Sequence, residues 1–215
     1  MRWLGSSSGF LLAQALTAQL NWGAAGGAAL HILSPRKEQW RQSAEFTRVD
    51  PTFGASIFLR PHLGGKSSLL ITADYVHRSF HANYQSGGIG SGNGGDFDVK
   101  LDVFYGGVAY EHRIESDSGT FVYIGLQVGR RMRAWATGDQ RDYGFGASHG
   151  TLENGAITDF GGDLRMIAGL RHVVHGFGKW RFTVNPTLGF GITSLLRQAP
   201  WSNSFEFGVA FGVLR

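Results

Sequence analysis

The most constraining feature of this chain is a strict two-residue alternation of side-chain character near its C-terminus. Residues 180 to 193 read WRFTVNPTLGFGIT, with large apolar residues or proline at every second position from Trp180 to Ile192. Successive side chains of a β-strand leave opposite faces, so this period predicts a strand with one apolar face. Such a face fits either the interior of a soluble antiparallel sheet or the lipid-facing side of a strand that crosses a bilayer.

The alternation recurs along the chain and predicts eight strands separated by turn-forming residues. The predicted strands are Leu20–Leu33, Pro51–Pro61, Ser67–Tyr84, Phe97–Ile114, Gly119–Thr137, Phe160–His175, Trp180–Thr193 and Ser204–Arg215. We expect the apolar set of each strand to lie on one common face of the sheet. In the fourth strand this outward-facing set is Val99, Leu101, Val103, Tyr105 and Ala109.

Short and long connections alternate strictly between the predicted strands. Three short Gly-containing turns (PHLGGK, ESDSG and HGFGK) alternate with longer segments at residues 34–50, 85–96, 138–159 and 197–203. In outer-membrane barrels, short turns face the periplasm and long loops face the outside. The sequence therefore predicts an all-β protein: an eight-stranded antiparallel up-and-down transmembrane β-barrel.

Composition excludes several classes of function. The 215 residues include no cysteine, which removes disulfides, thiolate zinc sites and cysteine nucleophiles. The net charge is only +4, and the basic residues are dispersed rather than gathered into the stripe that phosphate backbones require, so no nucleic-acid partner is expected. Past the N-terminus, no apolar run is long enough for a membrane-spanning helix.

The N-terminus has the features of an export signal. Arg2 precedes a mostly apolar segment, and Ala13-Gln14-Ala15 and Ala18 before Gln19 offer small-residue cleavage sites. We therefore expect residues 1–19 to be a signal peptide and residues 20–215 to be the barrel domain. The alternative is an ordinary buried first element.

Charged residues occupy the opposite parity of the predicted strands. If the apolar parity were the interior of a soluble barrel, these charges would simply face water. If it faces lipid, they point into a lumen only wide enough for side chains to fill, where mixed charges are expected to pair. The predicted lumen network is Arg60, Asp74, Lys100, Asp102, Arg131, Asp163, Arg165, Arg181 and Glu206, with Arg78, Asp98, Arg133 and Arg171 on the same parity.

Aromatic residues gather near the strand ends, as in the interfacial belts of membrane barrels. The expected interfacial residues are Trp22, Trp135, Trp180 and Trp201. A soluble, exported lipocalin-like carrier would need an evenly shaped apolar interior. The apolar face here runs instead from glycine and alanines in the first strand to crowded aromatics in the last two, which favours lipid.

The whole of residues 20–215 resembles the small outer-membrane β-barrel family of Gram-negative bacteria, of the OmpX, OmpA transmembrane-domain and PorT-like type. The last strand, FEFGVAFGVLR, is similar to the family's assembly signal, although it ends on Arg215 instead of an aromatic residue. The resemblance implies the bacterial outer membrane as location, with its lipids and the barrel-assembly machinery as partners. Pro186 lacks a backbone donor, so a bulge or a gap in the ladder is expected there.

Candidate chemical motifs are weak. GGIGSGNGG lacks the following helix of a nucleotide loop and is expected to be a flexible extracellular loop. His77 and His81 lie about 13 Å apart on a strand and cannot share a metal. Ser148, His149 and Glu153 offer the residue types of a hydrolase, but adjacent Ser and His are poorly placed to act on each other. No catalytic residue, cofactor or metal site is therefore predicted.

The sequence thus predicts a non-enzymatic outer-membrane barrel with a charge-plugged lumen, which is structural, adhesive or an accessory subunit of an envelope complex. Basic residues of the first long loop suit contacts with lipopolysaccharide phosphates, and a solvated polar loop is the equal alternative: Arg36, Lys37, Arg41 and Arg48. The alternatives are a narrow pore for small solutes and the soluble carrier.

Overall fold

A computed structural model describes residues 20–35, 42–49, 51–88, 91–114, 119–144, 149–156, 162–192 and 201–215. The expected signal peptide lies outside these residues. The described chain is built of strands: β1 (Leu20–Pro35), β2 (Gln42–Val49), β3 (Pro51–Gly64), β4 (Ser67–Gly88), β5 (Ser91–Arg113), β6 (Thr120–Gly144), β7 (His149–Ala156), β8 (Asp163–Phe177), β9 (Trp180–Gly191) and β10 (Trp201–Leu214). No helix among these residues is long and apolar enough to cross a membrane.

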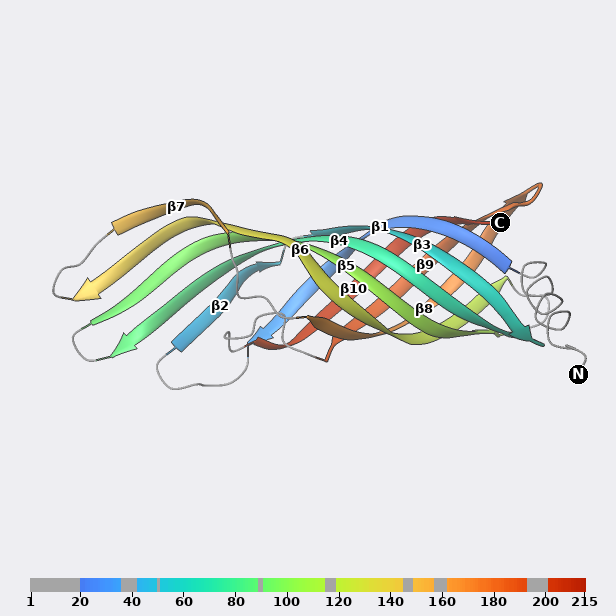
Figure 1. Cartoon of the computed structure of the whole chain (residues 1–215), viewed down its shortest axis with the longest axis horizontal. Helices are drawn as coiled ribbons and strands as arrows, with labels where there is room; N and C mark the ends of the chain where they lie inside the picture. The colour runs from blue at the N-terminus through green and yellow to red at the C-terminus, as the bar shows by residue number, and fades with distance from the viewer. Residues whose placement is uncertain are drawn as a thin grey trace, which may run out of the picture.

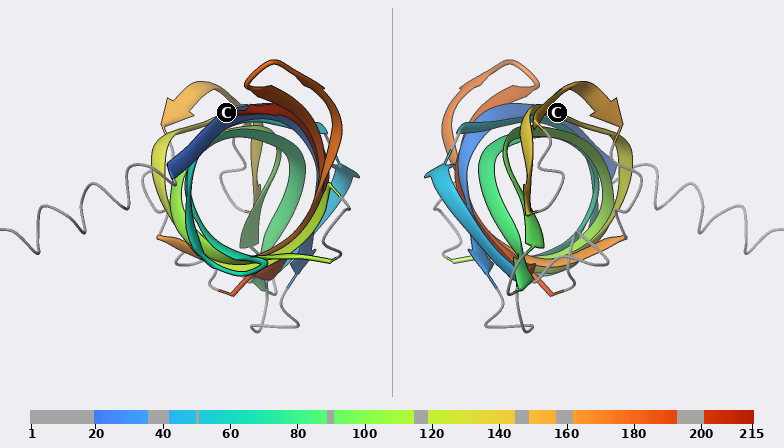
Figure 2. Two further views of the ribbon diagram at one scale, coloured as in Figure 1. Left: turned by 90° about the vertical axis from the view of Figure 1, so that its right-hand side faces the viewer. Right: turned by 90° about the vertical axis from the view of Figure 1, so that its left-hand side faces the viewer.

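Eight of the strands close into a ring, which the end-on views of Figure 2 show directly. Each ring strand pairs antiparallel with its neighbours in chain order, from β1 through β3, β4, β5, β6, β8 and β9 to β10. The pairing of β10 with β1 closes the ring along a register from Gly23↔Leu214 to Pro35↔Trp201. The predicted eight-stranded up-and-down barrel is therefore confirmed.

The predicted parity holds in seven of the eight ring strands. Apolar side chains point out of the barrel and are far more exposed than a soluble core allows, as at Ile57 (65%), Val128 (64%) and Phe211 (66%). Polar and charged side chains of the other parity are buried inside, as at Arg165 (6%) and Asn185 (6%). A barrel with this polarity needs an apolar solvent outside it.

The inward and outward faces of strand β5 are the reverse of those predicted. Leu101, Val103 and Tyr105 are almost fully buried inside the barrel, whereas Phe104 and Val108 are about half exposed on its outer surface. The register with β4 requires this orientation, because Leu101 pairs with the inward-facing Arg78. Cross-strand partners share a face of the sheet, so Lys100 and Asp102 lie on the outer face.

Three strands continue well beyond the ring and form a second structural unit. β4, β5 and β6 contain 22, 23 and 25 residues, whereas about 9 to 11 suffice to cross the hydrocarbon layer. Above the end of β3, strand β2 pairs with β4. Above the end of β8, strand β7 pairs with β6. The result is a five-stranded sheet, β2-β4-β5-β6-β7, which projects from one end of the barrel (Figure 1). We call it the projecting sheet.

Three of the segments predicted to be long loops instead contain strands of the projecting sheet. Segment 34–50 contains β2, segment 138–159 contains β7 and the upper end of β6, and most of the glycine-rich segment 85–96 continues the β4–β5 hairpin up to Gly88↔Ser91. Glycine lowers strand propensity, but the backbone groups here are bonded on both sides by neighbouring strands. The backbone hydrogen bonds between strands therefore outweigh the low strand propensity of glycine in this segment.

The two faces of the long strands exchange polarity part-way along. On β4 the outward residues change from Ile71 and Tyr75 to His77 and His81, while the inward residues above Asp74 are Val76, Arg78 and Phe80, two of them apolar. A second buried apolar cluster lies on the inner side around the level of the change: Val76, Leu101, Val103, Tyr105 and Ala134. The chain is thus apolar outside in the barrel and polar outside in the projecting sheet, so the bilayer ends near Tyr75 and Phe104.

The ladder has the expected gap at Pro186. Pairing between β8 and β9 skips from Gly169↔Thr187 to His172↔Val184 without a change of register. Proline has no N–H to donate, so the two strands lose contact at this position without a bulge. On its other side, Pro186 keeps its place opposite Val209 of β10.

Candidate functional site: the charged lumen and the projecting sheet

The centre of the lumen is filled by a network around Arg165. Its Nη1 lies 3.1 Å from Oε2 of Glu206, its Nη2 lies 4.0 Å from Oδ2 of Asp74, and its Nε donates to Oε1 of Gln127 at 2.7 Å. Gln127 in turn donates to Asp74 and to Thr72. The Arg165 guanidinium also stacks 3.8 Å from the centre of the Tyr105 ring. Five strands, β4, β5, β6, β8 and β10, are thereby joined across the barrel.

Arg78 adds a second cation to this network. It is 1% exposed, and its Nη2 donates to Oε2 of Glu206 at 2.9 Å while its Nη1 lies 3.6 Å from Oδ2 of Asp163. The Tyr105 hydroxyl donates to the same Asp163 carboxylate. A side chain on Gly129, which pairs with Tyr105, would overlap the tyrosine ring. Glycine at this position therefore permits Tyr105 to reach into the lumen.

A smaller network lies nearer the short-turn end. Glu111, 0% exposed, pairs with both Arg60 and Arg171, the latter at 3.1 Å between Oε1 and Nη1. Each arginine also stacks on a phenylalanine, Arg60 on Phe121 and Arg171 on Phe58. The two networks together contain equal numbers of positive and negative groups: Arg60, Arg78, Arg165 and Arg171 against Asp74, Glu111, Asp163 and Glu206.

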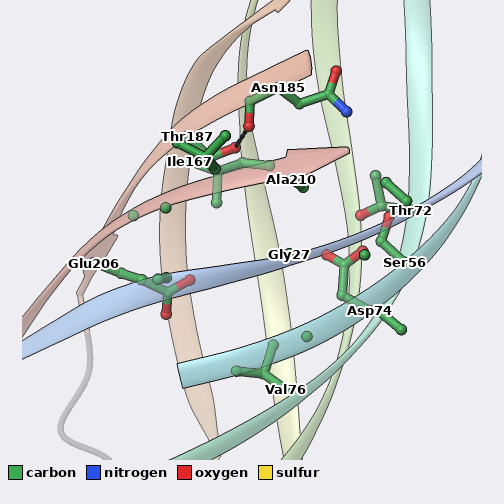
Figure 3. A pocket seen from close by; sticks show the side chains of 18 of the residues that line it. Gly27, Ser56, Thr72, Asp74, Val76, Ile167, Asn185, Thr187, Glu206 and Ala210 are labelled. Carbon is green, nitrogen blue, oxygen red and sulfur yellow. Dashed lines mark hydrogen bonds between the residues drawn. The ribbon is translucent and has the colours of Figure 1, made fainter. Parts of the chain in front are cut away.

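One wall of the lumen is lined by small residues and leaves a cavity of about 150 Å³ between that wall and the charged side chains. Gly27 and Ala210 belong to this wall, and the Asp74 carboxylate lies beside Ser56 and Thr72 on another side of the cavity (Figure 3). Polar cavities of this size in proteins hold a few water molecules.

The structure brings five of the nine predicted lumen charges together, namely Arg60, Asp74, Asp163, Arg165 and Glu206. Arg131 lies half-buried on the inward parity of β6. Arg181 is exposed at the barrel mouth on the short-turn side. Lys100 and Asp102 were predicted wrongly, since the orientation of β5 places both on the outer face.

Glu111, Gln127 and Tyr105 are residues of the lumen networks that the sequence prediction missed. Glu111 belongs to the parity of β5 that was expected to face lipid. Its pairing with the buried Ser68 of β4 places it in the lumen, and that register cannot be read from the sequence. Gln127 is uncharged and lies in a strand whose charges begin only at Arg130.

The predicted lumen position of Arg133 is also wrong, because β6 contains a β-bulge. Asp102 pairs with Arg133 and Val103 pairs with Arg131, so Met132 is an extra residue in β6. Beyond the bulge the parity of β6 reverses, and Arg133 faces outward beside Asp102. The bulge lies at the level where the two faces of the sheet exchange polarity.

The tryptophans lie at both edges of the apolar band. Trp22 and Trp180 contact each other edge to face, with ring centres 5.5 Å apart, at the short-turn end. Trp135 lies on the outer face near the opposite edge, 6.3 Å from the His77 ring. Trp201 begins β10 opposite Pro35, and its side chain lies outside the described residues. The side chains of Arg48, His149 and Glu153 also lie outside them, as do Arg36, Lys37, Arg41 and Ser148.

A row of histidine–carboxylate contacts runs along the outer face of the projecting sheet. His77 Nδ1 lies 2.7 Å from Oδ1 of Asp102. His81 contacts two carboxylates, with Nε2 2.6 Å from Asp96 and Nδ1 2.9 Å from Asp98. These contacts join β4 to β5 in water above the bilayer. The described residues contain no group of three or more such side chains arranged to hold a metal ion.

Protonated His81 is expected to stabilise the projecting sheet at mildly acidic pH. The hydrogen bond to Asp98 and the charge of Asp96 raise the pKa of His81 above its ordinary 6.5. The stabilisation is therefore complete below about pH 6.5 and disappears as the pH rises through the raised pKa. An NMR titration of His81 in detergent micelles measures this pKa directly. The pKa should fall in Asp98→Asn, and an unchanged value in that variant would contradict the assignment.

The closed ring, the exposed apolar band and the charged interior define a transmembrane β-barrel of the bacterial outer membrane. This polarity excludes a soluble lipocalin-like carrier, whose interior would be apolar. No protein-family model and no curated protein sequence matches the chain.

Solved structures of outer-membrane proteins have a similar shape. The attachment invasion locus protein Ail of Yersinia pestis is 14% identical, with a TM-score of 0.44 over 91% of this chain and 98% of that one. Neisserial surface protein A is 13% identical, with a TM-score of 0.46 over 91% and 96% of the two chains. The N-terminal barrel of Pseudomonas aeruginosa OprF is 11% identical, with a TM-score of 0.33 over 90% and 97%. The similarity concerns the fold alone.

Proposed function

We propose that this chain is a non-catalytic, non-conducting outer-membrane barrel that presents the projecting sheet for contact with other molecules, as an adhesive or accessory component of the envelope. The exchange of polarity along β4, β5 and β6 carries this proposal. Strands that serve only to cross a bilayer need no continuation, whereas these continue for many residues with an apolar inner face and a polar outer face. Such a continuation is a folded platform held at a fixed distance from the membrane.

The paired lumen supports a barrel that does not conduct. Arg78, Gln127 and Tyr105 are almost fully buried and meet near the middle of the lumen. Breaking one pair leaves a buried charge uncompensated, which costs about 3–5 kcal/mol. Thermal motion therefore does not readily open a path through the network.

Lipopolysaccharide phosphates are the proposed partners at the bilayer edge. Arg130 and Arg133 are both exposed on the outer surface of β6, on either side of the exposed Met132. Arg133 pairs with Asp102, two residues above Phe104, where the apolar band ends. Arginine forks suit phosphate groups, and an exposed Met suits the acyl chains beneath them. The barrel-assembly machinery is a further proposed partner, through the outward Phe205, Phe207 and Phe211 of β10.

Single cysteines test the platform, because the chain contains none of its own. Asn83→Cys in the projecting sheet is expected to react with a membrane-impermeant maleimide on intact cells. Lys179→Cys in the β8–β9 turn, at the opposite end of the barrel, should react only after the outer membrane is permeabilised. Heat-modifiable gel migration shows that both variants are folded. Protection of Asn83→Cys together with labelling of Lys179→Cys on intact cells would overturn the proposed orientation.

A narrow pore is the second candidate, because the lumen retains its 150 Å³ cavity. Planar-bilayer recordings separate the two functions. We expect no conductance steps from the wild-type barrel, and steps that disappear on heat denaturation would favour the pore.

A further inference from the structure

The short-turn end of the barrel contains a second cavity, of about 610 Å³, whose described charged lining is entirely basic. The cations come from β3, β5 and β9, from the residue after β10 and from the β3–β4 and β8–β9 turns: Arg60, Lys66, Arg113, Lys179, Arg181 and Arg215. In outer-membrane barrels this end faces the periplasm. We call the cavity the periplasmic vestibule. None of its described lining residues is acidic.

Carboxylates do not offset these cations to the extent seen in the middle of the lumen. Glu111 is shared between Arg60 and Arg171 below the floor of the vestibule. Lys66, Lys179 and Arg181 form no ion pair with any residue that the structure describes. Glu115 and Asp117, in the β5–β6 turn, lie outside the described residues. The vestibule therefore carries more positive charge than its described surroundings neutralise.

A buried hydroxyl group gives the vestibule a second feature of a binding site. Ser68 lines the cavity, is 1% exposed, and its Oγ has no hydrogen-bond partner. Buried polar atoms are normally satisfied, so an unpaired one that faces a cavity indicates a ligand or water. Arg60 and Arg113 both stack on Phe121, with Cζ 4.4 Å and 5.0 Å from the ring centre. The ring thus holds two guanidinium groups at one wall of the cavity.

We propose that the periplasmic vestibule binds phosphate-bearing anions. Several converging cations favour a ligand with more than one negative charge, arginines and lysines both bind phosphate oxygens, and the Ser68 hydroxyl is a matching donor. Two sources share this chemistry: a soluble phosphate compound of the periplasm and the headgroup of an anionic lipid in the inner leaflet. Arg215, whose Cζ lies 5.7 Å from the Trp180 ring centre, places part of the site near the lipid headgroups.

Calorimetric titration of the intact barrel in zwitterionic nanodiscs with pyrophosphate tests the site. Binding should weaken with added salt, because the contacts are between charges. The triple variant Lys66→Gln/Lys179→Gln/Arg181→Gln should weaken it by about tenfold or more, which corresponds to at least 1.4 kcal/mol. Ser68→Ala should weaken it without changing any charge.

The matched control is Lys100→Gln/Arg141→Gln, which removes two exposed cations at the opposite end. It should leave pyrophosphate binding unchanged. Nanodiscs that contain phosphatidylglycerol identify the source: competition with pyrophosphate indicates a lipid headgroup, and unchanged affinity indicates a soluble anion. Absence of binding in zwitterionic discs, or a loss in the control variant as large as that in the triple variant, would overturn the proposal.

Discussion

Replacing Glu111 with Gln is expected to destabilise the barrel by about 3–5 kcal/mol, the cost of leaving buried charges without their partner. Glu111 is fully buried and is the carboxylate that both Arg60 and Arg171 contact. The amide keeps the size of the side chain but removes its charge, so two guanidinium groups stay in the lumen without a counterion. Urea unfolding in phospholipid vesicles, followed by the fraction of heat-modifiable barrel on gels, measures the free energy of unfolding.

Two controls show that the loss comes from uncompensated charge. Asp96→Asn removes a carboxylate that is 51% exposed and is expected to change stability by less than about 1 kcal/mol. The triple variant Glu111→Leu/Arg60→Met/Arg171→Met removes all three charges and should recover much of the stability, because apolar packing often replaces a buried ionic triad without loss. A loss below about 1 kcal/mol in Glu111→Gln would contradict the role given to this network.

The barrel itself could be predicted because the bilayer imposes a simple pattern. A strand that separates lipid from a polar lumen must alternate strictly, as Trp180–Gly191 and Trp201–Leu214 do. Turns of fixed shape also have a clear signature, as at Gly64, Gly65 and Gly178, whose positive φ angles suit glycine. These local signals predict the strand number, the order of connections and the outward face of seven strands.

The orientation of β5 could not be predicted in the same way, because alternation gives a period but not a direction. Apolar residues at Val99 and Leu101 resemble a lipid-facing set, yet they form the inner face of the projecting sheet in water. Nothing in the local sequence marks where the strand leaves the membrane. The cross-strand register with β4 determines the orientation, and a single sequence does not contain that register.

The lumen network could also be predicted only in part. Parity alone places Asp74 and Arg165 inside, but the choice of partners depends on how far each strand is shifted along its neighbours. Glu206 of β10 thus contacts Arg78 of β4 across the barrel, 128 residues away in the chain. The β-bulge at Met132 exchanges the inward and outward positions of β6, and no residue type at this position predicts it.

Adjacent residues of β5 allow a direct test of the orientation. Tyr105→Ala is expected to destabilise the barrel by about 3–5 kcal/mol, as for other buried aromatic residues cut back to alanine. Tyr105 is 0% exposed, donates a hydrogen bond to Asp163 and stacks against Arg165. Its loss leaves a cavity and removes contacts from two buried charges. The free energy of unfolding is again measured with urea in vesicles.

Phe104→Ala is the matched comparison. Phe104 is 46% exposed on the outer surface, where lipid chains fill the space that the ring leaves. Its truncation should therefore cost clearly less than that of Tyr105, because no fixed cavity forms. If Tyr105 faced lipid, as the alternation of β5 alone predicts, the order of the two losses would be reversed. The sign of this difference therefore decides which face of β5 lines the lumen, and with it whether Lys100 and Asp102 belong to the outer surface.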